Sequence, residues 1–145
     1  MRLFLDISLA TAQVLTTGGK FIVTAERDEK IRVSHFPNSY NIEAFCLGHT
    51  CHVSALAVHK LDHEQGEEDL LVSGGVDGSL RLWRLPDGQP LHTLKVGELI
   101  VTGADAAVNS ESPAGHPAPG VEAIALTRGI SGDGDICKIA VTFTR

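Results

Sequence analysis

An all-β fold built from repeated four-stranded sheets is predicted for this chain of 145 residues. The main observation is an internal repeat: residues 21–34 (FIVTAERDEKIRVS) align without a gap to residues 70–83 (LLVSGGVDGSLRLW). Each copy has an apolar strand, a four-residue polar turn and an alternating strand, which is typical of a β-hairpin. The second copy also carries the marker side chains of a propeller blade. The sequence therefore predicts a partial β-propeller of the WD-repeat type, with about two blades and the start of a third.

Four residues mark the complete blade. His49 follows a glycine, Ser73 lies in an apolar run, Asp77 lies in a turn, and Trp83 ends the next run. In a propeller blade such side chains hydrogen bond in series, from the Asp to the His, to the Ser hydroxyl and to the indole N–H. Because buried polar groups need partners, we expect this network to tie a loop to the strands.

The first copy keeps only part of this set. Thr24 and Asp28 align with the serine and the aspartate of the second copy, whereas Ser34 stands in the place of the tryptophan. We therefore expect a degenerate first blade.

The remaining segments complete the predicted organisation. We expect an inner strand for the first blade at residues 3–9 and a polar surface loop at residues 59–69. Further strands are predicted at residues 42–46, 53–58, 91–94, 121–127 and 136–143. The predicted units are a first blade (1–47), a second blade (48–97), a linker or long loop (98–120) and a partial third blade (121–145).

Blade number sets a further expectation. Propellers typically close with about 4–8 blades, because open blades leave unpaired sheet edges and uncovered apolar faces. We therefore expect this sequence to be part of a longer propeller, with a self-closing oligomer as the alternative.

Composition excludes several classes of protein. The formal net charge is −6 with only 12 Lys and Arg residues, which argues against a main nucleic-acid-binding surface on this chain. The apolar runs are too short for a membrane span, so no membrane partner is expected. Three cysteines match no disulfide framework, which favours a reducing compartment, the cytoplasm or the nucleus.

The sequence predicts no catalytic, metal or cofactor site. The four blade residues include the types of a hydrolase triad, but the chain has no Gly-x-Ser-x-Gly turn. The Cys and His residues at 46–52 lack a second pair with zinc-ligand spacing, and the His residues at 59 and 63 lie in a polar stretch. The glycine-rich stretch 129–135 has neither a P-loop ending nor an EF-hand glutamate, so a hairpin turn is expected there.

The charged run at residues 26–32 has two interpretations. It could be an ordinary solvated hairpin tip. Alternatively, Lys30 and Arg32 share one strand face, opposite apolar neighbours, and Arg27 and Arg32 could offer guanidinium groups to carboxylates of a partner.

Two stretches of this chain are more specific than a generic blade. Residues 21–34 and 42–50 (IEAFCLGHT) together resemble the non-catalytic WD-repeat subunit of the tRNA (guanine-N(7)-)-methyltransferase. The resemblance implies a scaffold that binds and stabilises the catalytic methyltransferase subunit, has no cofactor of its own, and meets tRNA indirectly through the complex. It further implies that Arg32 pairs with an acidic residue of the catalytic subunit, with Lys30 and Arg27 as helpers.

We expect a location in the nucleus, with the cytoplasm as a second location. The alternative function is a WD-repeat adaptor in another complex, such as ubiquitin ligation or signalling. In an adaptor, ligands usually engage the top face or the central channel of the propeller, and Arg32 should not matter.

Overall fold

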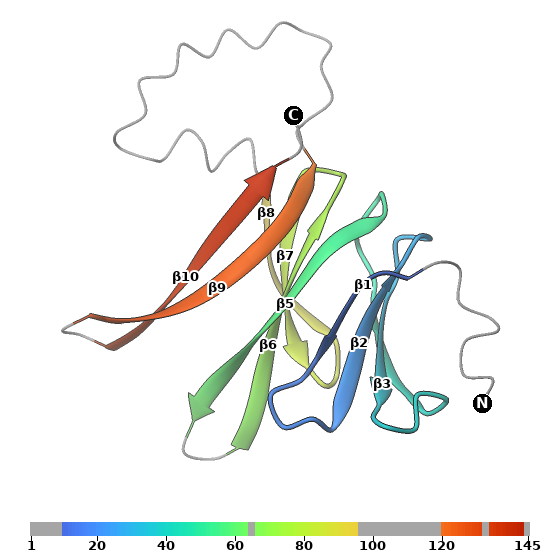
Figure 1. Ribbon diagram of the computed structural model, residues 1–145, viewed down its shortest axis with the longest axis horizontal. Helices are drawn as coiled ribbons and strands as arrows, with labels where there is room; N and C mark the ends of the chain where they lie inside the picture. Colours follow the sequence, from blue (N-terminus) through green and yellow to red (C-terminus); the bar gives the residue numbers. More distant parts are fainter. Residues whose placement is uncertain (1–9, 64–65, 96–119, 132–133, 144–145) are drawn as a thin grey trace, which may run out of the picture.

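The computed structural model describes residues 10–63, 66–95, 120–131 and 134–143 (Figure 1). Two antiparallel four-stranded sheets follow one another along the chain, and a two-stranded hairpin follows them. The first sheet contains β1 (Ala10–Leu15), β2 (Phe21–Glu26), β3 (Ile31–His35) and β4 (Ile42–Cys46); the second contains β5 (Val53–His63), β6 (Gly66–Gly75), β7 (Ser79–Leu85) and β8 (Gln89–Lys95); the hairpin contains β9 (Val121–Ser131) and β10 (Gly134–Phe143). The described sheets do not close into a ring, so the predicted all-β, partial propeller is confirmed.

The first strands of the three units lie next to each other. β1 contacts β5, and β5 contacts β9, as expected of successive inner strands around a propeller axis (Figure 1). Similar hydroxyl bonds link them: Thr11 Oγ1 donates to the Val53 carbonyl, and Ser54 Oγ donates to the Val121 carbonyl. Because these bonds satisfy backbone carbonyls between sheets, they help to set how one blade sits against the next.

Two apolar clusters form the core. Successive residues of a strand point to opposite faces of its sheet. One face of the second sheet packs against the first sheet, and the other face packs against β9. The first cluster includes Val23, Ala25, Ile31, Val33, Leu71 and Trp83. The second includes Ala55, Val72, Leu80 and Val121. Each cluster therefore joins two neighbouring units rather than filling a single blade.

The predicted position of the first inner strand is wrong. The strand that pairs with β2 is β1 at residues 10–15, whereas the prediction placed it at residues 3–9, which lie outside the described residues. β1 consists mainly of short or polar side chains, so its hydrophobic signal is weak, but Ala12 and Val14 pack against the core. A turn at residues 16–20, with Gly19 at φ 66°, then suffices to reach β2.

The predicted surface loop at residues 59–69 is also wrong. β5 continues to His63 and β6 begins at Gly66, and backbone pairing runs through Lys60↔Asp69 and Asp62↔Glu67. Backbone hydrogen bonds do not depend on side-chain polarity, so a polar sequence can prolong a hairpin beyond its apolar part.

The other strands lie where the sequence predicted them, with ends shifted outward. β9 and β10 approach each other closely enough that Gly134 pairs with Ser131, which agrees with a hairpin turn in the glycine-rich stretch. The predicted linker lies outside the described residues except for Gly120. Across the described ranges, the chain has no helix with the length and hydropathy that a membrane crossing requires.

Candidate functional site

A series of hydrogen bonds links the four marker residues of the second blade. His49 Nδ1 lies 3.0 Å from Asp77 Oδ2, and His49 Nε2 lies 2.8 Å from Ser73 Oγ. Trp83 Nε1 donates to the same serine oxygen over 2.8 Å. An ionised carboxylate can only accept, so Nδ1 carries the ring proton and Nε2 accepts from the Ser73 hydroxyl.

Two further residues complete this network, and the sequence reasoning did not name them. Ser79 Oγ lies 2.7 Å from Asp77 Oδ1, and the backbone N–H groups of Thr50 and Ser79 donate to the same carboxylate over 3.0 Å each. Gly75 leaves the space that the network needs, because a Cβ there would lie 2.6 Å from Asp77 Oδ1 and 2.7 Å from His49 Nδ1. A serine two positions after a turn aspartate is the signal that could have predicted Ser79.

The electrostatics agree with a structural role for this network. Burial lowers the pKa of His49, and the nearby Asp77 charge offsets only part of that effect. Burial opposes ionisation of Asp77, but hydrogen bonds from Ser79 and from the Thr50 and Ser79 backbone lower its pKa to about 2. A neutral histidine beside an ionised, fully bonded aspartate holds strands together, and the buried Ser73 is not presented to a substrate.

The first blade uses the aligned positions differently. Glu26 aligns with Gly75 of the second blade, and its buried carboxylate pairs with Arg32. Thr24 is buried on the same strand, whereas the Asp28 carboxylate pairs with Lys30 Nζ at 2.9 Å on the exposed turn. Thr24 and Asp28 are therefore not brought together as Ser73 and Asp77 are through His49.

The basic residues of this hairpin occupy different environments. β3 begins at Ile31, so Lys30 lies in the turn just before the strand, and the expectation that Lys30 and Arg32 share one face stays a prediction. Arg27 is exposed at the same turn. The Asp28 side chain raises the pKa of Lys30 and Lys30 lowers the pKa of Asp28, but both groups are solvated, and such pairs add little stability.

Arg32 is the least exposed of these cations. Its side chain is 21% exposed, and its Nη2 lies 2.5 Å from Oε1 of the buried Glu26. Arg32 Nε and Glu26 Oε1 are both buried, and neither has a hydrogen-bond partner among the described residues. The contact between the two side chains is therefore an ion pair rather than an aligned hydrogen bond. The Arg32 guanidinium also lies 5.9 Å from the centre of the Phe45 ring on β4, within range of a cation–π interaction.

The sequence reasoning missed both neighbours of Arg32. Glu26 lies at the end of β2 and Phe45 pairs directly with Arg32 across β3 and β4. Cross-strand pairing places such side chains on one face, but their identity depends on the register, which the sequence alone did not supply. One sequence signal marks Glu26 as unusual: in the second copy of the repeat, the aligned residue is Gly75.

The cysteines and histidines do not form a described metal site. Within the described ranges, no group of three or more His, Cys, Asp or Glu side chains is close enough to hold a metal ion. Cys46 is buried, and burial, with a smaller contribution from Asp87, raises the pKa of its thiol to about 12. Cys51 lies exposed on the connection between β4 and β5, so the two thiols occupy unlike environments.

Comparison with solved structures supports the propeller architecture. The WD40 repeats of RRP9 superpose with a TM-score of 0.54 over 79% of this chain and 27% of theirs, at 18% identity. A computationally designed protein, Ika4, superposes with a TM-score of 0.52 over 91% of this chain and 65% of its own. At such low identity these similarities show the fold alone.

Sequence comparison identifies the family. Proteins named tRNA (guanine-N(7)-)-methyltransferase non-catalytic subunit are 46% identical over 74 residues in Dictyostelium discoideum, 44% over 88 in Danio rerio and 40% over 93 in Homo sapiens. These matches cover 51%, 61% and 64% of this chain but only 15%, 20% and 21% of the relatives. The model of the "tRNA methyltransferase TRM82 WD40 domain" matches residues 2–128, and the chain therefore belongs to this WD40 family.

Proposed function

We propose that this chain belongs to a non-catalytic subunit of a tRNA N7-methylguanosine methyltransferase and binds the catalytic subunit through the β2–β3 hairpin. The names of the relatives support the complex, because each is a non-catalytic subunit of that enzyme. Binding would stabilise the catalytic subunit and support tRNA modification, with tRNA met indirectly. The nucleus, with the cytoplasm as a second location, is the place we propose for this activity.

The observation that carries the proposed contact is the environment of Arg32. A fully exposed arginine would gain about 0–1 kcal/mol from an ion pair with a partner. Arg32 is 21% exposed and is held by Glu26 and the Phe45 ring, so less side-chain entropy is lost when a partner binds. A carboxylate of the catalytic subunit would meet the exposed part of the guanidinium, and Lys30 and Arg27 add positive charge at the adjacent turn.

The internal Glu26–Arg32 pair decides which variants test this contact. Arg32→Glu would place a second carboxylate against the buried Glu26, so the loss of binding could follow from local unfolding. The double variant Glu26→Gln/Arg32→Gln removes both charges and keeps similar shapes. Glu26→Gln is the matched control, because it removes the same internal pair but leaves Arg32 in place.

The experiment is co-expression with the catalytic subunit, followed by affinity purification and a titration of the two purified proteins. We expect the double variant to lose about 2 kcal/mol of binding, roughly 30-fold in Kd, because an unpaired partner carboxylate is left at the interface. We expect Glu26→Gln to bind within about threefold of the parent chain, a change of under about 0.7 kcal/mol. Unchanged binding of the double variant would refute the Arg32 contact and favour an adaptor that binds through another face.

A further inference from the structure

The two aligned arginines of the repeat have different cross-strand neighbours. In the second blade, Arg81 pairs with Thr93 on β8, and Arg81 Nη1 donates to Thr93 Oγ1 over 3.3 Å. In the first blade, Arg32 occupies the aligned position and pairs with Phe45 on β4. The second-blade arginine therefore has an acceptor within its own blade, where the first-blade arginine has an aromatic ring.

Arg32 lacks the cross-strand hydroxyl acceptor that Arg81 has in Thr93. The Phe45 ring holds the guanidinium by a cation–π contact at 5.9 Å, but it accepts no conventional hydrogen bond. Glu26 pairs with Nη2 from the other side, and Nε is buried without a hydrogen-bond partner among the described residues, as is Nε of Arg81. The two contacts position the guanidinium, and the exposed part of the side chain, 21% of its surface, is what an external carboxylate can meet.

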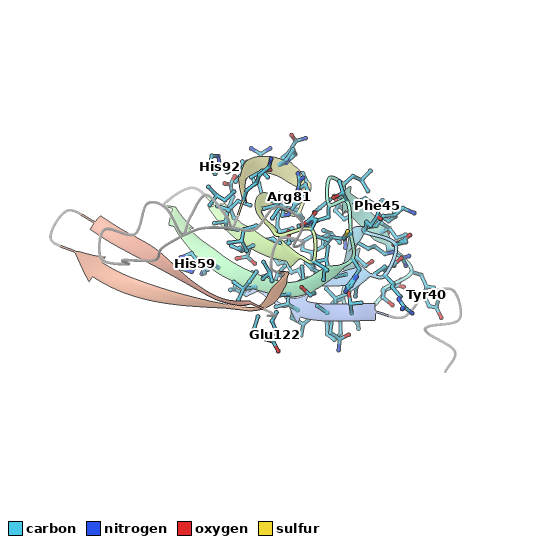
Figure 2. The ribbon with its side chains drawn as sticks, turned by 90° about the horizontal axis from the view of Figure 1, so that it is seen from above. Tyr40, Phe45, His59, Arg81, His92 and Glu122 are labelled. Carbon is cyan, nitrogen blue, oxygen red and sulfur yellow. The ribbon has the colours of Figure 1, made fainter. Side chains whose placement is uncertain are left out.

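Phe45 itself is accessible at this site. Its side chain is 43% exposed, and Leu47, two residues further along, is also exposed. Figure 2 shows Phe45 at the end of the molecule away from the β9–β10 hairpin. An aromatic ring beside an arginine, with a second apolar side chain nearby, is the composition that protein interfaces favour at their centres.

The second blade indicates that a neighbouring blade would not cover Phe45. The face of the second sheet that carries Arg81 and Trp83 packs against the first sheet, yet Thr93 on the outer strand stays exposed there. Phe45 has the same place on the outer strand of the first sheet. By this comparison, a blade preceding the first sheet would cover the inner strands and leave Phe45 accessible.

We infer that Phe45 is a partner-binding residue, and that with Arg32 and Leu47 it forms a surface for a segment of the catalytic subunit that carries a carboxylate next to an aliphatic side chain. This inference rests on the proposed function. The carboxylate binds the exposed part of the Arg32 guanidinium, and the aliphatic group covers the exposed Phe45 ring and Leu47. Charge complementarity at Arg32 and continuity with the proposed hairpin contact select this partner.

The test replaces the first-blade neighbour by the second-blade one. Phe45→Thr removes the ring and offers Arg32 the hydroxyl acceptor that Arg81 already has. Ile42→Thr is the matched control, because Ile42 lies at the other end of β4 and is 42% exposed, against 43% for Phe45. We expect Phe45→Thr to raise the Kd for the catalytic subunit at least about tenfold, and Ile42→Thr to change it less than about twofold.

Each outcome bears on the inference. Equal effects of Phe45→Thr and Ile42→Thr, or no effect of either, would overturn it. If the Glu26→Gln/Arg32→Gln variant still loses binding in that case, the proposed function stands and only the role of Phe45 fails. If Phe45→Thr does not fold, as judged by circular dichroism, Phe45→Leu serves instead: it keeps an apolar side chain without the ring face, and unchanged binding by it would overturn the cation–π part of the surface.

Discussion

Removal of the Ser73 hydroxyl is the most direct test of the second-blade network. Ser73 is fully buried, and its oxygen is the shared partner of Trp83 Nε1 and His49 Nε2, each at 2.8 Å. In Ser73→Ala, the indole N–H and the imidazole nitrogen both stay buried without a partner. An unsatisfied buried polar group costs about 1–3 kcal/mol, so we expect a total loss of about 2–4 kcal/mol in the free energy of unfolding.

The assay is equilibrium unfolding in urea, followed by far-ultraviolet circular dichroism and by fluorescence of Trp83, the one tryptophan of the sequence. Thr93→Ala is the control, because it removes a hydroxyl at an exposed position of the same sheet and should change stability by less than about 0.5 kcal/mol. A loss below about 0.5 kcal/mol for Ser73→Ala would refute the reasoning.

A double-mutant cycle separates the network from simple loss of packing. Trp83→Phe removes the indole N–H that Ser73 accepts, so in the Ser73→Ala background it no longer breaks a hydrogen bond. We expect the two losses to be non-additive by at least about 1 kcal/mol. Strict additivity would show that the hydrogen bond adds nothing beyond the two side-chain volumes.

Two more predictions concern pH and packing. The fold lowers the pKa of His49 below 6.5 and that of Asp77 from 3.8 to about 2. As the pH falls, the unfolded chain therefore takes up these protons at a higher pH than the folded chain does, and the folded state loses stability. Urea midpoints should be highest above pH 6.5, fall below it, and fall further below pH 3.8; a rise on acidification through pH 6.5 would contradict this. Gly74→Ala should destabilise the chain by about 1–3 kcal/mol, because its Cβ would lie 2.3 Å from Val121 Cγ1. In thermal unfolding, Gly74→Ala/Val121→Gly, which removes both Cγ1 and Cβ of Val121, should lose less than the sum of the single losses; full additivity would argue against the clash.

Prediction from the sequence worked best where two copies of one pattern could be compared. The aligned hairpins gave β2, β3, β6 and β7, because an apolar run, a polar turn and an alternating run are local signals. The signal failed at β1, where small and polar side chains supply an inner strand, and at the β5–β6 extension, where backbone pairing continues through a polar sequence. In both places pairing with a neighbouring strand, not side-chain hydrophobicity, sets the secondary structure.

For the candidate site, too, some features follow from the sequence and others only from the tertiary structure. The sequence by itself determined the repeat, the order Asp77, His49, Ser73 and Trp83, and the presence of Arg32 on a hairpin, since these depend on residue identity and spacing. Only the tertiary structure decided that Glu26 and Phe45 hold Arg32. The physical reason is register: a shift of one residue would turn each side chain to the opposite face of the sheet, and long-range pairing selects among these arrangements.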